Sequence, residues 1–82
     1  MKLVKFPIII FSYNRPTHLQ KSLDVLYKNK FIKHHKIFFF NDGPKNLTDK
    51  YKIEKIKKII NQYKSLINFT EIKFNKKNKG LF

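Results

Sequence analysis

The sequence predicts a small α/β protein in which three strands and two helices alternate in the order β-α-β-α-β. Apolar runs of strand-forming residues alternate along the 82-residue chain with segments whose apolar residues recur every three or four positions. The connections between them are short and contain turn-forming residues. This alternation implies a parallel sheet joined by right-handed crossovers, here one half of a doubly wound fold. An α+β protein with antiparallel strands is the alternative.

The first strand is expected between Phe6 and Tyr13, where the sequence reads FPIIIFSY. A continuous apolar run, rather than one that alternates with polar residues, is typical of a strand covered on both faces. Pro7 stands near its start, where a missing backbone N–H is tolerated. We therefore expect a buried strand, which the sequence Asn14-Arg15-Pro16 ends.

An amphipathic helix of about three turns follows this break and ends near Asn29. Proline favours the first helical position, so Pro16 is the expected start. A capping box over Thr17–Gln20 offers an alternative start. The apolar stripe of this helix consists of Leu19, Leu23 and Leu26. A basic loop then leads to the second strand, and we expect its two histidines, His34 and His35, at the surface.

The second strand is expected at Ile37–Phe40, a fully apolar run that the turn formers Asn41-Asp42-Gly43-Pro44 close. Thr48 or Asp49 is the expected cap of the next helix, which runs for about four to five turns. The apolar stripe of that helix consists of Ile53, Ile56, Ile60, Tyr63 and Ile67. Phe69–Phe74 then alternates apolar and polar residues, as a strand with one wetter face does.

The composition is strongly basic, with a formal net charge of +14 and a single arginine. Lys, Ile, Phe and Asn make up more than half of the chain, so we attribute most lysines to A- and T-rich codon usage. Nucleic-acid surfaces usually favour arginine with interleaved aromatics, and no specific nucleic-acid partner is expected. The positive field favours anionic substrates or a lipid surface. With no cysteine, disulfides and thiolate metal sites are excluded, and a cytoplasmic location is expected.

Ligands of open parallel sheets bind outside the carboxyl ends of the strands. The candidate residues share a position just beyond such an end: Tyr13, Asn14 and Arg15 after the first strand, Asp42 and Gly43 after the second, and Asn78 and Gly80 after the third. Polar Ser12, Asn41 and Asn75 stand at the same three ends. Because these ends meet at one edge of the sheet, the sequence predicts a cluster of hydrogen-bonding groups around one carboxylate.

Each residue type at this edge suits part of a nucleotide. An isolated acid such as Asp42 suits an N–H donor such as the uracil ring nitrogen, and Tyr13 can stack on a flat base. The planar fork of Arg15 suits bidentate contact with phosphate. Turn chemistry alone would also explain Asn14 and the Asp42-Gly43 pair, and a solvated surface charge would also explain Arg15.

Three segments in register carry a resemblance to a known family. FPIIIFSYNRPTHLQKSLDVL, KIFFFNDGPKN and NKKNKGLF resemble the amino-terminal region of GT-A fold glycosyltransferases, closest to family-2-like enzymes and the relatives of N-acetylglucosaminyltransferase I. The shared pattern is an apolar strand ending in Tyr/Cys-Asn-Arg-Pro, a second ending in Asp-Gly, and a third leading into Asn-x-Gly-Leu. The resemblance spans nearly the whole chain, and it implies a Rossmann-like, nucleotide-binding sheet.

The resemblance also implies a role for each candidate residue. Tyr13–Arg15 line the nucleotide pocket, with Arg15 near the base or the diphosphate. Asp42 accepts a hydrogen bond from the base of a UDP-sugar donor. Asn78 and Gly80 begin the loop that closes over the nucleotide.

The chain departs from this family in one respect. The family places an Asp-x-Asp-type motif after its fourth strand to hold a divalent metal, Mn or Mg, and a catalytic base further on. The metal neutralises the leaving diphosphate, a role that lysines replace poorly. Residues 1–82 stop short of both features, so we expect a single partial domain with no catalytic residue and no metal of its own. It is expected to be inactive alone, as a truncated product, a fragment or one piece of a split enzyme.

Several expectations about partners follow from this interpretation. The ligand is a nucleotide-sugar donor, and the acceptor is an unidentified glycan or lipid-linked molecule, which leaves peripheral contact with the inner face of a membrane open. An unpaired sheet edge favours self-association. The alternatives are a small basic module that binds RNA or another polyanion, and an inactive remnant without a ligand.

Overall fold

The computed structural model describes residues 6–79 of the chain. The elements follow in the order β1 (Ile8–Ser12), α1 (Pro16–Lys28), the short 3₁₀ helix η1 (Lys30–His34), β2 (Ile37–Asn41), α2 (Leu47–Tyr63) and β3 (Glu71–Phe74). The strands form one sheet in the order β1-β2-β3, and both neighbouring pairs are parallel. The predicted β-α-β-α-β arrangement, half of a Rossmann-like sheet, is therefore confirmed, and the antiparallel alternative is wrong.

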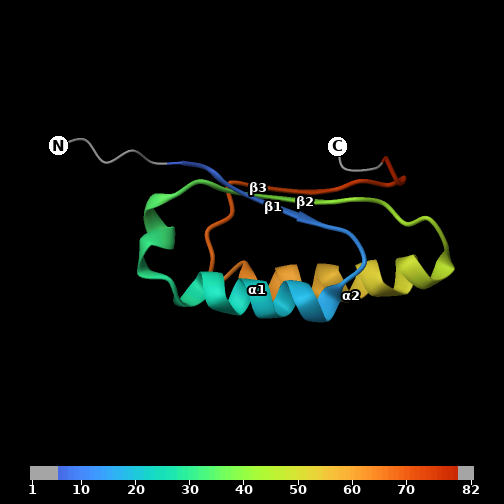
Figure 1. The fold of residues 1–82 in the computed structure, drawn as a ribbon, viewed down its shortest axis with the longest axis horizontal. Coiled ribbons are helices and arrows are strands. Elements are labelled where there is room, and N and C mark those ends of the chain that lie inside the picture. The colour runs from blue at the N-terminus through green and yellow to red at the C-terminus, as the bar shows by residue number, and fades with distance from the viewer. Residues whose placement is uncertain (1–5, 80–82) are drawn as a thin grey trace.

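Both helices lie on the same face of the sheet (Figure 1). The sheet adds its strands in one direction, and crossovers of one hand then place successive helices on one side. The α1 and α2 helices pack against each other beneath the strands. The molecule thus has two layers within the described residues, a three-stranded sheet and a pair of helices.

The expectation that the first strand is covered on both faces is wrong for residues 6–79. Ile8 and Ile10 pack against the core below the sheet, whereas Ile9 and Phe11 are 51% and 54% exposed. The apolar run is continuous in sequence, but only the side chains at alternate positions reach the helices, because strand side chains point to opposite faces in turn. On the outer face Phe40 stacks on Phe11, with ring centroids 5.9 Å apart.

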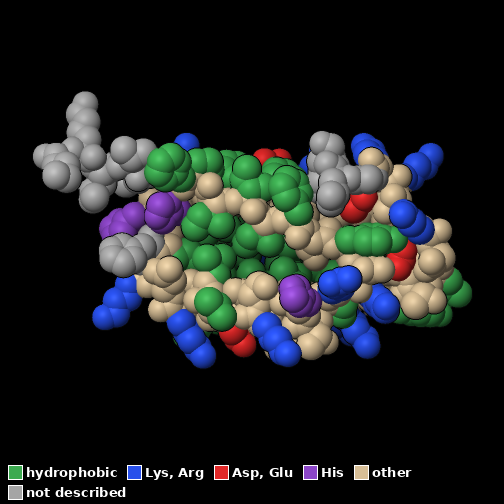
Figure 2. Space-filling view, viewed as in Figure 1, with side chains coloured by type: hydrophobic (Ala, Val, Ile, Leu, Met, Phe, Trp, Pro, Cys, Tyr) green, Lys and Arg blue, Asp and Glu red, His purple; other side chains and the backbone are tan. Residues whose placement is uncertain are grey.

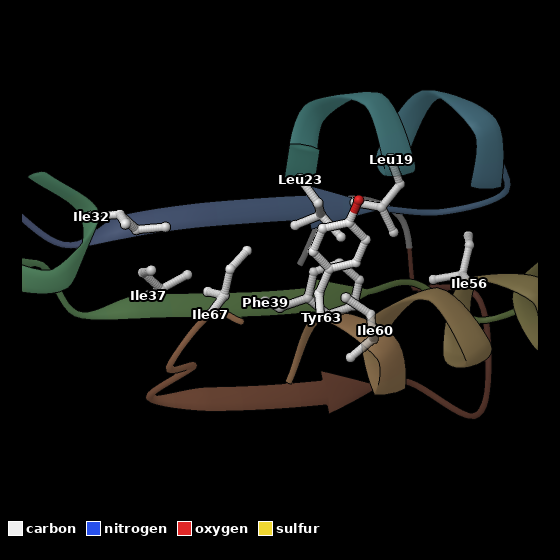
Figure 3. Close-up of a cluster of buried hydrophobic side chains, with 9 residues drawn as sticks. All are labelled: Leu19, Leu23, Ile32, Ile37, Phe39, Ile56, Ile60, Tyr63 and Ile67. Atoms are coloured by element: carbon white, nitrogen blue, oxygen red, sulfur yellow. The ribbon is translucent and has the colours of Figure 1, made fainter. Parts of the chain in front are cut away.

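The core lies between the sheet and the two helices (Figure 3). It contains buried apolar residues of both helices, the inward side chains of β2, one residue of η1 and one that follows α2: Leu19, Leu23, Ile32, Ile37, Phe39, Ile56, Ile60, Tyr63 and Ile67. Phe39 of the central strand is fully buried, and the ring of Phe69 packs edge-on against it at 6.4 Å between centroids. The helical periodicity of the sequence predicted six of these positions, and the second apolar run predicted Ile37 and Phe39. Ile67 was expected within the helix, but it lies beyond the end of α2 at Tyr63.

The helix starts differ in how they are capped. Pro16 opens α1 as predicted, and the residue before it, Arg15, offers no side-chain cap. The cap of α2 is Asn46, whose Oδ1 accepts from the backbone N–H of Asp49 at 2.9 Å. The prediction of Thr48 or Asp49 as the cap is wrong, because the helix begins two to three residues earlier. Asn46 is the capping residue, and its backbone is extended.

Other elements link the two layers. The hydroxyl of Tyr63 in α2 donates to Asp24 in α1 and so ties the helices together. The segment between α1 and β2 forms η1 rather than the expected loop, since its Ile32 is buried in the core. The third strand starts at Glu71, two residues later than predicted. Among the described helices, none combines the length and apolar character needed to cross a bilayer.

Candidate functional site

The three strands end at one edge of the sheet, where both helices begin (Figure 1). In the register of the sheet, Ser12 of β1 is opposite Asn41 of β2, and Asn41 is opposite Phe74 of β3. The residues that follow these positions therefore emerge together. The expected common edge for Tyr13, Asp42 and the residues after β3 is present.

The candidate carboxylate, Asp42, is buried, with only 4% of its surface exposed. Its Oδ1 accepts from the backbone N–H groups of Gly43 at 2.8 Å and Lys79 at 2.9 Å. Burial alone would raise the pKa of this carboxyl. The N–H groups of Lys79 and Gly43, together with the Asn75 amide and the charge of Lys45, outweigh burial, so the pKa lies below its usual value. Asp42 is therefore an ionised carboxylate, held by its own chain.

Gly43 and Asn78 meet beside Asp42. The Asn78 amide donates to the Gly43 carbonyl at 3.1 Å. The backbone of Lys77 lies so close to Gly43 that a Cβ added there would come within 2.3 Å of the Lys77 carbonyl carbon. Only glycine fits this approach, so Gly43 has a packing role that holds the segment after β3 against the end of β2.

Two buried amide atoms next to Asp42 have no hydrogen-bond partner among the described residues: Oδ1 of Asn41 and Nδ2 of Asn75. Asn41 is completely buried, and its Nδ2 donates to the Asp42 carbonyl at 2.8 Å. The amide of Asn75 lies near enough to the Asp42 carboxylate to contribute to its lowered pKa, although Nδ2 lacks proper hydrogen-bond geometry. The edge thus holds one unused acceptor and one unused donor.

A second carboxylate, Asp49 in the first turn of α2, organises the loop after β1. It accepts from the Tyr13 hydroxyl, from Asn14 Nδ2 at 2.9 Å and from the Lys45 backbone N–H at 3.0 Å. The hydrogen bond from Tyr13 contributes most to lowering the pKa of Asp49, and the one from Asn14 comes second. The Tyr13–Asp49 hydrogen bond is also the main cause that raises the pKa of Tyr13. Tyr13 and Asn14 are therefore brought together by a residue that sequence reasoning assigned only to helix capping.

The structure brings together six of the seven predicted site residues at this edge. Tyr13 and Asn14 are half-buried, while Arg15 is exposed at the start of α1. Gly80 lies outside the described residues. Asn41 and Asn75, expected at the strand ends but not assigned to the site, belong to the same edge. Asp49 also belongs to it and was not predicted there. The spacing of Asp49 from its cap Asn46 signals a helix start, but nothing in the sequence shows that its carboxylate reaches Tyr13.

A large hollow lies at the other end of the sheet. It has a volume of about 1010 Å³ and is bordered by the segments around Ile32–Phe38 and Lys64–Thr70. Its lining includes Lys33, Lys36 and Lys64 and no acidic residue. At the candidate edge, a depression of only about 270 Å³ borders the start of α2. The volumes alone would therefore favour a ligand site at the opposite end of the sheet, whereas the convergent hydrogen-bonding groups favour the candidate edge.

The described residues do not fit a divalent metal. Residues 6–79 contain no group of three or more His, Asp or Glu side chains that could hold one. The two carboxylates at the edge are already engaged by N–H and O–H donors of the chain.

Comparison of the chain with models of known protein families, with curated proteins and with solved structures finds no match. The fold and the geometry of the edge are therefore the evidence that bears on the function.

Proposed function

We propose that the carboxyl edge of the sheet is the nucleotide half of a nucleotide-sugar donor site, with UDP as the nucleotide. The observation that supports this most is the convergence of Tyr13–Arg15, Asp42 and Asn78 at the edge where open parallel sheets bind ligands. In a full-length or complemented glycosyltransferase, this segment would hold the donor while an acceptor hydroxyl attacks the sugar and the nucleoside diphosphate leaves.

The start of α1 favours a diphosphate at this edge, beside the two carboxylates that donors of the chain already engage. Both helices begin there, and the N–H groups of a helix start carry a partial positive charge that attracts anions. The α1 start has no side-chain cap, so its first-turn N–H groups face no competing oxygen from a capping side chain. Arg15 precedes that start and is exposed, where its guanidinium is able to reach a phosphate.

The base would be read by the ionised Asp42. In a chain with net charge +14, a carboxylate held among backbone N–H groups has the correct polarity for the ring N–H of uracil. Tyr13, half-buried and fixed by Asp49, would offer its ring as a stacking surface.

The first experiment separates the phosphate contact from the base contact. Arg15→Ala is compared with Lys21→Ala, which removes the same charge from an exposed position within α1. We expect Arg15→Ala to weaken UDP binding about tenfold or more, since a charge-assisted hydrogen bond is lost, and to leave uridine binding unchanged. Lys21→Ala leaves both unchanged. Equal losses in the two variants would point to general attraction of anions.

The second experiment tests the base contact. Asp42→Asn and Glu54→Gln remove the same charge, but Glu54 is exposed on α2 and paired with Lys57. Only Asp42→Asn is expected to weaken both UDP and uridine. Unchanged affinity in a folded Asp42→Asn protein would remove Asp42 from the site.

Binding of RNA or another polyanion is the second candidate, and the hollow at the amino ends of the strands favours it. Lys33, Lys36 and Lys64 line that hollow without an acid. Figure 2 shows lysine and arginine side chains spread along the outline of the visible face rather than gathered in one patch. A polyanion would bind with a steep salt dependence and would ignore Asp42→Asn.

A further inference from the structure

The carboxylate that the proposed donor site needs is covered by the chain itself. Residues 75–79, here called the strap, follow β3 and run across the end of β2. The backbone N–H of Lys79 donates to Asp42 Oδ1, and Asp42 is almost completely buried. A base cannot reach this carboxylate while the strap lies in this position.

Three further contacts hold the strap close to the end of β2 and the residues that follow it. The backbone N–H of Asn75 donates to the Asn41 carbonyl at 2.9 Å, which extends the sheet pairing by one bond. The Asn78 amide donates to the Gly43 carbonyl, and Lys77 approaches the Gly43 backbone too closely for any side chain to fit. No space remains between the strap and the Asp42-Gly43 backbone for a planar ring.

The closed strap also leaves polar atoms unsatisfied. Oδ1 of Asn41 and Nδ2 of Asn75 are buried beside Asp42 without a partner among residues 6–79. A buried donor or acceptor without a partner destabilises the arrangement that contains it. The closed position therefore includes a local cost, which a ligand or water that supplies both groups would remove.

We propose that the strap is an internal competitor of the donor, with the Lys79 N–H occupying the position on Asp42 that the N–H of the base takes on binding. This inference rests on the proposed function. The donor binds after the strap has left Asp42, so the apparent affinity is the intrinsic affinity reduced by the fraction of molecules in which the strap is open. Asp42 thus alternates between a backbone partner and a ligand partner.

Substitutions in the strap distinguish this inference from a direct binding role of Asn78. If Asn78 contacts the nucleotide, Asn78→Ala weakens UDP binding. If the strap competes, Asn78→Ala removes a contact that holds it closed and tightens UDP binding. Lys79→Pro provides a second, independent variant, because it removes the competing N–H without changing Asp42.

The test measures UDP binding by calorimetry to the full 82-residue chain. We expect Asn78→Ala and Lys79→Pro to tighten binding about three- to tenfold. This is the gain expected when molecules with a closed strap outnumber those with an open strap by a similar factor and that excess is removed. Lys76→Ala, an exposed change within the strap, serves as the control and leaves affinity unchanged. Equal or weaker UDP binding by folded Asn78→Ala and Lys79→Pro proteins would overturn the inference.

Amide hydrogen exchange distinguishes an error in the strap inference from an error in the proposed function. The Lys79 amide is expected to be protected in the free protein, to lose protection in Asp42→Ala and to keep it in Glu54→Ala. If UDP binds, saturation with UDP lowers the protection of Lys79; unchanged or greater protection overturns the competition. If UDP does not bind to any variant, the proposed function is wrong, and the Lys79 protection in the free protein still decides whether Asp42 holds the strap.

Discussion

Replacing Gly43 by alanine tests the contact that closes the edge of the sheet. The added Cβ would lie 2.3, 2.5 and 2.7 Å from the carbonyl carbon, the carbonyl oxygen and the Cα of Lys77. All three atoms belong to the backbone, so no side-chain rotation relieves the overlap. Either the strap or the end of β2 has to move.

The expected cost follows from what each movement breaks. Displacement of the strap loses the hydrogen bonds from Asn78 to the Gly43 carbonyl and from Lys79 to Asp42, while the core beneath the sheet keeps its packing. Overpacking of a closed contact typically costs about 1–3 kcal/mol, and we expect Gly43→Ala to lower the free energy of unfolding within that range.

Urea unfolding measures the change in the free energy of unfolding, and amide hydrogen exchange shows which residues lose protection. Gly43→Ala should abolish the protection of the Lys79 amide and leave the amides of Phe39 and Ile56 protected. The double variant Gly43→Ala/Lys77→Gly is the control: it removes the Lys77 side chain but not its backbone, so it should not restore stability. Unchanged stability with intact Lys79 protection, or rescue by the double variant, would refute the close backbone contact.

Further predictions concern the core and the titrating groups. Ile56→Ala empties a fully buried position between the helices and the sheet and should lower the free energy of unfolding by about 2–5 kcal/mol in urea titrations; a loss below about 1 kcal/mol would contradict the packing. The hydrogen bond to Asp24 is the largest of the causes that raise the pKa of Tyr63 to about 12, so the stability from this bond is present below about pH 10 and lost as the pH rises through 12. Tyr63→Phe should therefore lower the melting temperature at neutral pH by about 5 °C and reduce the loss of stability at alkaline pH; identical pH profiles for the two proteins would contradict the link. The Tyr13 hydroxyl, followed by the other donors, lowers the pKa of Asp49, so its stabilisation is present above about pH 4 and lost as the pH falls through the lowered value. Asp49→Asn should reduce the acid sensitivity seen in unfolding curves between about pH 5 and 2, and an unaltered acid limb would show that the cluster contributes nothing.

Much of the architecture was predictable because the periodicity of apolar residues reports local structure directly. The spacing of Leu19 and Leu23, and of Ile53, Ile56 and Ile60, identified both helices and their buried faces. The parallel order followed from the alternation of strands with helices.

The uncovered face of the sheet was not predictable in the same way. A continuous apolar run such as Ile8–Phe11 is equally compatible with a strand covered on two faces and with a strand covered on one face. Which face is covered depends on where the helices pack, and this is a property of the assembled layers.

The candidate edge was predictable only in its location. Strand ends identify which residues emerge together, so Tyr13, Asp42 and Asn78 were expected at one edge. The partner of each side chain was not predictable, because Asp49 reaches Tyr13 across 36 residues of sequence and Lys79 reaches Asp42 across 37. Such contacts depend on the conformations of loops, which carry no periodic signal.

The most direct measurement is a titration of the isotopically labelled protein with UDP, followed by the backbone amide resonances in two-dimensional NMR spectra. Saturable shifts should appear at the residues that follow the strands, in Tyr13–Arg15 and Asp42-Gly43, and the amides of Lys33 and Lys36 at the opposite end should stay unchanged. Shifts confined to the Lys33–Lys36 end, or no saturable shift at millimolar UDP, would contradict a nucleotide site at the carboxyl edge of the sheet.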